Sequence, residues 1–272
     1  MSESTESTSG QGMSIDDYLA AGGRMSSPSN VPPRYRGELM RLMATFVDSE
    51  LAGSAGFADV VNEGPGIKER ISASRIALEK LDHADRVLDI MGDFGADTSR
   101  YFGRHPWTAR LARDADIGAS RHGDDMRLAV FHYPLDGWSD AVTMNVLMGT
   151  AVTVQLQELA RVSYQPLAEV FGAVLPRERH HAELGVEGLR KLLQDADEKP
   201  AVQASVAYWW PRVETSFGTV TAGNADSTRF DALVRFGLRH ASNETLFAQW
   251  RERMEAVLGE LELDTPSRPT SH

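Results

Sequence analysis

Long stretches of the chain repeat apolar residues at helical spacing, and no stretch shows the strict alternation of a β-strand. Between Tyr35 and Phe57 the apolar side chains recur three and four residues apart, which places them on one face of a helix. The same period returns over about 67–91 and 138–164, in a fourth segment that Pro176 begins or kinks, and over about 200–217, 226–240 and 243–262. The pattern predicts an all-α protein, a four-helix bundle with additional C-terminal helices.

The first and last segments have a different composition. Residues 1–32 are rich in Ser, Thr, Gly, Glu and Pro, which predicts a disordered N-terminal tail, with a short helical turn near 14–21 as the one alternative. Residues 33–263 are predicted to form the helical domain, and 264–272 a second disordered tail. Within the domain, 93–137 is less regular and is expected to hold short helices and a loop at 131–134.

Charge and composition exclude several classes of protein. The formal net charge is -11 without a compensating basic stripe, which argues against nucleic-acid binding. The chain has no cysteine, so disulfides, thiolate metal sites and a cysteine nucleophile are excluded. No apolar run approaches the roughly 20 residues that a membrane helix needs, and the N-terminus lacks the pattern of a secretory signal. We therefore expect a cytoplasmic protein.

Polar residues interrupt the apolar stripes of the predicted helices at a few positions. Glu50 falls on the stripe of the first long helix. Lys80 and His83, three residues apart, fall on the stripe of the second, and Glu178 and His181 on that of the fourth. Burial of a lone charge is costly, so these groups are expected to meet one another in the core.

Such a set is typical of carboxylate–histidine metal sites. In di-iron bundles two helices each supply one carboxylate, and two others each supply a Glu-x-x-His pair. Glu178 and His181 form a complete pair, Glu50 fits a single-carboxylate helix, and His83 fits the histidine of the second pair. Glu50, His83, Glu178 and His181 are therefore the predicted metal ligands.

Several separate stretches of the chain keep the order and spacing of motifs found together in one known family. They are Pro33-Arg34-Tyr35-Arg36 through Glu50, Gly64-Pro65 through His83, Phe131-His132-Tyr133-Pro134 with Trp138, Ser163-Tyr164, Glu178 with His181 and Gly185, Trp209-Trp210-Pro211, Phe217-Gly218 and Ser242-Asn243-Glu244. From about Pro33 to Pro266 the chain thus resembles the catalytic A subunit of the bacterial phenylacetyl-CoA ring epoxygenase, a phenylacetic acid catabolic protein of the ferritin-like superfamily.

The resemblance implies a ferritin-like fold and an oxygenase that inserts oxygen into an aromatic acyl-CoA. It also implies partners, namely a related ferritin-like subunit and a reductase that delivers electrons. A homodimer is the alternative assembly that we expect from this fold.

The chain departs from the family at two ligand positions. Lys80 stands where the family has the Glu of the second helix, and Gly149, with Thr150 beside it, stands where the family has an Asp. A shift in register would offer Glu79 or Asp82 instead. Lys80 itself has three interpretations: a solvated lysine, a buried counter-ion of Glu50 and Glu178, or a catalytic amine with a lowered pKa. We favour the counter-ion, which also occurs in the family's non-catalytic subunit.

Three hypotheses about function follow. The first is an oxygenase-type component that acts on an aromatic acyl thioester or a similar substrate and holds iron in an incomplete di-iron site. The second is a metal-free scaffold or pseudoenzyme subunit with Lys80 in the metal position. The third is a redeployed biosynthetic enzyme without redox chemistry, in which Lys80, Glu50 and Glu178, with His181, transfer protons. Whether the chain is an enzyme stays open at this point, and the metal-free state is favoured over bound iron.

Overall fold

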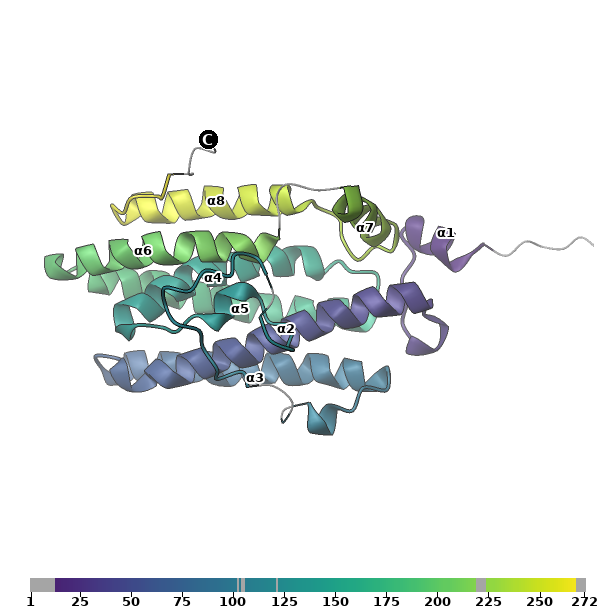
Figure 1. The fold of residues 1–272 in the computed structure, drawn as a ribbon, viewed down its shortest axis with the longest axis horizontal. Helices are drawn as coiled ribbons and strands as arrows, with labels where there is room; N and C mark the ends of the chain where they lie inside the picture. Colours follow the sequence, from purple (N-terminus) through teal and green to yellow (C-terminus); the bar gives the residue numbers. More distant parts are fainter. Residues whose placement is uncertain (1–12, 102, 104–105, 121, 219–223, 268–272) are drawn as a thin grey trace, which may run out of the picture.

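The helices of the protein run side by side in layers (Figure 1). The computed structural model describes residues 13–101, 103, 106–120, 122–218 and 224–267. The bundle consists of α2 (Pro33–Val60), α3 (Ile67–Asp93), α4 (Gly137–Leu159) and α5 (Gln165–Leu192). α2 packs on α3, α4 packs on α5, and α3 also contacts α5, which closes the bundle.

The additional helices cover one side of this bundle. They are α6 (Lys199–Glu214), α7 (Asn224–Arg235) and α8 (Asn243–Glu260), and α6 and α8 both pack on α4 (Figure 1). Trp209 and Trp250 are fully buried between these layers. The only β-type pairing in the described part of the chain is an isolated bridge between Met25 and Tyr164. The predicted fold class, an all-α ferritin-like bundle with additional C-terminal helices, is confirmed.

Local sequence accounts for several helix ends. Pro33 occupies the first turn of α2, where the missing N–H costs nothing. Gly64-Pro65-Gly66 separates α2 from α3. The side chain of Ser242 accepts a hydrogen bond from the backbone N–H of Thr245 and so caps α8. The segment between α3 and α4 is irregular, as predicted, with short 3-10 helices at Thr98–Arg100 and Ala129–His132.

Three predicted boundaries differ from the structure. The third bundle helix ends at Leu159, not near Tyr164, because the backbone of Ser163 pairs with Met25 and Gly237 instead of continuing the helix. The fourth helix begins at Gln165, so Pro176 lies inside α5 and does not begin it. α7 ends at Arg235, five residues earlier than predicted.

In the described part of 1–32 the structure has the alternative, a short helical turn near 14–21, and not the disorder that the composition predicts. Residues 15–20 form α1 (Ile15–Ala20), with Ser14 as its N-cap, and Leu19 is almost completely buried in the main core. The backbone N–H of Met25 donates to Ser163 O at 2.8 Å. The buried Leu19 side chain and this backbone hydrogen bond tie the segment to the bundle. Residues 1–12 lie outside the described part.

At the other end, Asp264 is held by the side chain of Gln203, which exchanges two hydrogen bonds with the Asp264 backbone. The predicted tail therefore begins at least one residue later than expected, and its residues 268–272 lie outside the described part. No helix among the described residues combines the length and the apolarity that crossing a membrane would require.

Candidate functional site

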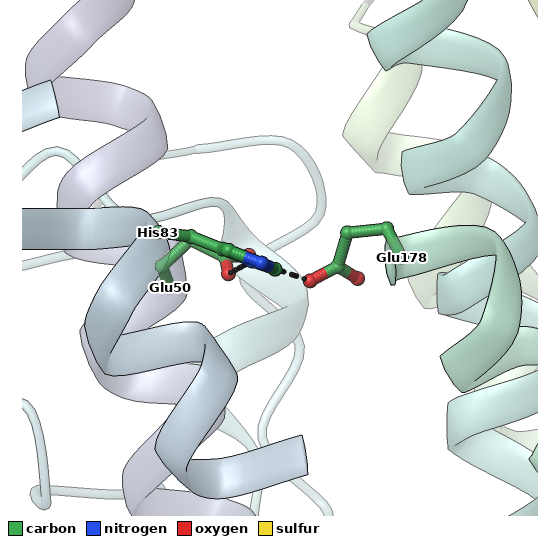
Figure 2. A group of neighbouring side chains, drawn as sticks. All are labelled: Glu50, His83 and Glu178. Carbon is green, nitrogen blue, oxygen red and sulfur yellow. Dashed lines mark hydrogen bonds and ion pairs between the residues drawn. The ribbon is translucent and has the colours of Figure 1, made fainter. Parts of the chain in front are cut away.

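The predicted polar residues converge on one place in the middle of the bundle. Glu50 comes from α2, Lys80 and His83 come from α3, and Glu178 reaches across from α5 (Figure 2). All of these side chains are buried. They meet because each lies on the inward stripe of its helix, as the helical spacing predicts.

Lys80 joins the two carboxylates. Its Nζ donates to Glu50 Oε1 at 3.1 Å, to Glu178 Oε1 at 3.0 Å and to Glu178 Oε2 at 3.2 Å. The ammonium group thus lies where both carboxylates can accept from it. Gly53 on α2 leaves room for the lysine, because a Cβ at that position would lie 3.3 Å from Lys80 Cδ.

His83 forms a second link between the same carboxylates. Its Nδ1 lies 3.2 Å from Glu50 Oε2 and 3.1 Å from Glu178 Oε1 (Figure 2). The other ring nitrogen, Nε2, has no hydrogen-bond partner among the described residues. Ligand atoms of Glu50, His83 and Glu178 all lie within 4.8 Å of one another, a spacing at which these groups could hold a metal ion.

The charges of the cluster are coupled. Burial by itself would lower the pKa of Lys80, but the charges of Glu178 and Glu50 outweigh it and raise the pKa. Burial also opposes the charged form of His83, yet its bonds to Glu178 and Glu50 raise the pKa of His83 to about 9. Conversely, Lys80 and the two histidines hold the pKa of Glu178 well below its usual range despite burial.

Two cations and two anions therefore compensate one another at neutral pH. The interpretation of Lys80 as an amine with a lowered pKa is wrong, because the direction of the shift is the opposite. The interpretation of Lys80 as a solvated lysine is also wrong, since the side chain is buried.

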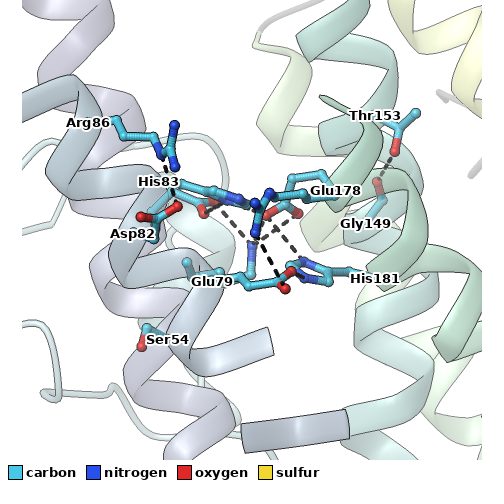
Figure 3. A network of polar contacts seen from close by, with 12 residues as sticks. Ser54, Glu79, Asp82, His83, Arg86, Gly149, Thr153, Glu178 and His181 are labelled. Atoms are coloured by element: carbon cyan, nitrogen blue, oxygen red, sulfur yellow. Dashed lines mark hydrogen bonds and ion pairs between the residues drawn. The ribbon is translucent and has the colours of Figure 1, made fainter. Parts of the chain in front are cut away.

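His181 lies at the edge of the cluster. Its Nδ1 is 3.4 Å from Glu178 Oε1, without the alignment of a hydrogen bond, and its Nε2 lies 2.7 Å from Glu79 Oε2 (Figure 3). Glu79 thus touches the site through His181. Asp82, the other alternative from a shift in register, pairs with Arg86 at 2.9 Å and points away from the cluster (Figure 3).

α4 brings no carboxylate to the cluster. Gly149 packs against α5 so closely that a Cβ would lie 3.2 Å from Ala182 Cβ. Thr150 Oγ1 donates to Val146 O within its own helix. Glu158, one of the two acidic residues of α4, accepts from the backbone N–H groups of His240 and Ala241.

An apolar pocket reaches the cluster from the side of α4 and α7. Its volume is about 260 Å³, and Glu50 and Ser49 belong to its lining. Phe46, Phe131 and Met148 supply apolar wall, and the exposed Arg229 on α7 lies at its edge. The pocket therefore borders the cluster on the side of Glu50.

Three buried carboxylates, Asp48, Asp125 and Asp140, were not predicted from the sequence, and two of them join separate parts of the fold. Asp48 accepts from the Tyr101 hydroxyl, from Trp107 Nε1 and from the backbone N–H of Met126, and so anchors the irregular segment to α2. Asp140 accepts from both guanidinium nitrogens of Arg113 and from Trp209 Nε1. Asp48 follows the buried Val47 and Asp140 precedes the buried Ala141. Their position next to the apolar stripe of a helix is the sequence signal that could have predicted their burial. Their contacts are structural.

One protein family matches this chain. The family model described as phenylacetic acid catabolic protein matches residues 13–272. The match therefore includes α2, α3, α4 and α5, the four helices around the buried cluster. Among curated proteins, no match to the chain was found.

Proposed function

The chain belongs to the phenylacetic acid catabolic protein family, and from this premise we propose that it is a metal-free subunit of a multicomponent aromatic-acid oxygenase. In this proposal Lys80 takes the place of metal ions, and the subunit supports a related ferritin-like subunit that carries out the oxygen chemistry. A reductase would serve that catalytic subunit. The observation that carries the proposal is the position of the Lys80 ammonium group, between the carboxylates of Glu50 and Glu178.

The donor set does not fit a pair of iron ions. Such a pair in a bundle of this kind is bound by four carboxylates and two histidines, whereas among the described residues only Glu50 and Glu178 contribute carboxylates to this cluster. Both already bind an ammonium ion. A bound dication would have to displace Lys80 from them, and the displaced charge would remain buried beside it.

The helix packing adds a weaker argument. A Cβ at Gly149, where the resemblance to the family places an aspartate, would lie 3.2 Å from Ala182 Cβ and 3.4 Å from Ala182 Cα. α5 would have to shift slightly to admit a side chain there. The replacement of one ligand by Lys80 and this close approach at the position of another both support a metal-free core.

A metal-binding oxygenase component is the second candidate function. Two observations favour it. The ligand atoms of Glu50, His83 and Glu178 lie close enough together to hold one ion, and Glu50 also belongs to the lining of the apolar pocket. The pocket would then receive the aromatic end of an acyl thioester. Proton-transfer chemistry without redox is less well supported, because the raised pKa values of Lys80 and His83 keep both groups charged at neutral pH.

Metal content distinguishes these candidates. Inductively coupled plasma mass spectrometry of the chain, purified from iron-supplemented cells, is expected to find iron far below one ion per chain. A Lys80→Glu variant is expected to acquire iron, because it replaces the internal cation by a third carboxylate. About two irons in each native chain would overturn the proposal, and about one would favour the second candidate. A Lys191→Glu variant, changed at an exposed lysine, is the matched control.

A further inference from the structure

One face of α3 carries a row of apolar side chains that no described part of the chain covers. The exposed fractions are 76% for Ile67, 51% for Ile71, 66% for Leu78 and 42% for Leu81. α3 lies at the outer edge of the bundle, so this row faces outward (Figure 1). Exposed apolar residues are ordinary when they are scattered, whereas a contiguous row marks a surface for interaction.

The row has the spacing of a coiled-coil seam. Its positions, here called the α3 seam, alternate in steps of four and three along the helix: Ile67, Ile71, Ser74, Leu78, Leu81, Asp85 and Leu88. The opposite face of α3, with Ile76, His83 and Val87, is buried in the bundle. α3 therefore has one apolar face that packs in the bundle and a second apolar stripe that is exposed on the outside.

We propose that the α3 seam pairs antiparallel with the α3 seam of a second copy of this chain. When Leu78 is placed opposite Leu81 of the second copy, Ile71 comes opposite Leu88, and Ser74 comes opposite Asp85. Each layer then occurs twice by two-fold symmetry. Between Ile71 and Leu88 apolar residues then meet apolar residues and polar residues meet polar residues, while Ile67 lies opposite Gly92. A parallel, in-register pair would instead place Asp85 against Asp85.

The charges beside the seam support the antiparallel direction. Charged residues come directly after every second seam position and flank the seam on one side. They are Lys68 and Arg75 in the first half of α3, and Asp82 and Asp89 in the second half. In an antiparallel pair these positions face one another, so Lys68 lies beside Asp89 and Arg75 beside Asp82 of the second copy. Within the described residues Asp82 also pairs with Arg86, whereas Lys68, Arg75 and Asp89 are not held in any ion pair.

A shallow groove beside the seam gives room for side chains of a second helix. It has a volume of about 420 Å³ and is lined by Leu78, Leu81 and Leu88 of the seam, with Leu51 of α2 and Thr98 on its far side. Side chains of the second copy would extend the buried surface from α3 onto α2. The proposal rests on this surface alone, and it does not depend on whether Lys80 replaces a metal ion.

Sedimentation velocity on the full chain, over a range of concentrations, tests the assembly. The native chain is expected to be dimeric. Each dimer has two central layers in which Leu78 of one copy faces Leu81 of the other. Leu78→Glu places a charge in both layers and should raise the dimer dissociation constant roughly 100-fold or more. Val234→Glu, at an exposed apolar position of α7, is the matched control and should leave it unchanged. A monomeric native chain, or a dimer that Leu78→Glu leaves intact, would overturn the proposal.

A charge exchange tests the identity of the partner. Asp89→Lys alone brings a second lysine beside Lys68 of the second copy and should weaken the dimer. The double variant Lys68→Asp/Asp89→Lys should restore it, because the exchanged charges pair again. The double variant places an acidic residue near the N-terminus of α3 and a basic residue near its C-terminus, which the helix dipole favours. The stability of the helix itself should therefore not decrease. Failure of the double variant to regain the dimer, with an unchanged circular dichroism melt, would contradict this pairing.

Cysteine cross-linking tests the direction. The chain contains no cysteine, so introduced ones react without background. In the antiparallel pair the two copies of residue 71 lie about 25 Å apart along the helix axis, and a single Ile71→Cys variant should stay uncross-linked under mild oxidation. Ile71→Cys/Leu88→Cys should give a covalent dimer. A covalent dimer of the single variant would show a parallel pair, and a dimer that forms only with a related subunit present would show a different partner.

Discussion

At the scale of single residues, Lys80 compensates the two carboxylates of the buried cluster. A buried carboxylate is unfavourable unless a cation or several hydrogen bonds compensate it, and Glu50 and Glu178 both take Lys80 as that cation. A buried ion pair contributes little compared with apolar packing, but removal of one partner leaves an uncompensated charge. The contribution of Lys80 to the free energy of unfolding is therefore measured by a variant that removes its charge.

Lys80→Met is expected to reduce the free energy of unfolding by about 3–5 kcal/mol, because it leaves Glu50 and Glu178 buried without their shared cation. Urea unfolding followed by circular dichroism measures this change. Lys191→Met, at an exposed lysine that pairs with Glu69, should cost no more than about 0.5 kcal/mol.

The triple variant Lys80→Met/Glu50→Gln/Glu178→Gln separates charge from packing. It should regain most of the stability that Lys80→Met loses, because the uncompensated charges are gone. A triple variant as unstable as the single one would mean that the aliphatic part of Lys80, and not its charge, supports the core.

At the scale of helices, the contact between α4 and α5 depends on glycines. A Cβ at Gly185 would lie 2.9 Å from both Val146 Cγ2 and Asn145 Nδ2. Asn145 in turn donates to His181 O at 2.8 Å, which ties the contact to the edge of the buried cluster. The glycines therefore set the distance at which α5 presents Glu178 and His181 to α3.

Two glycine substitutions on α5 should have opposite effects. Gly185→Ala is expected to destabilise the protein by about 1–3 kcal/mol through overpacking. Gly172→Ala, where a Cβ meets nothing within 4 Å, should stabilise it by up to about 1 kcal/mol because alanine favours the helix. Thermal unfolding of both variants gives the comparison, and equal effects of the two would contradict the close approach of the helices.

At the scale of the whole molecule, the buried cluster links stability to pH. The pKa of His83 rises on folding from 6.5 to about 9, so its contribution is fully present below pH 6.5 and is lost as the pH rises toward 9. The pKa of Glu178 is lowered on folding, so its contribution is present above pH 4.5 and is lost as the pH falls below that value. Between these limits the cluster contributes most.

The free energy of unfolding should therefore fall by about 2 kcal/mol between pH 7 and pH 10 because of His83 alone. Urea titrations at several pH values measure this slope. His83→Gln should flatten it, whereas His180→Gln, at an exposed neighbour of His181, should leave it as in the native chain. A slope that persists in His83→Gln would assign the titration to another group.

The sequence by itself determined the helices and their inward faces, because a helical period can be read from neighbouring residues. Glu50, His83 and Glu178 could therefore be assigned to one buried site from their positions on those faces. The helical turn near 14–21 could be read from the sequence, but its packing on the bundle could not, because local composition outweighs the few apolar side chains, Leu19 among them, that hold it. The tertiary structure alone decided the partners of Lys80, Glu79 and Asp82, and the close approach of α5 to Gly149. These depend on distances between helices far apart in sequence, which no local pattern contains.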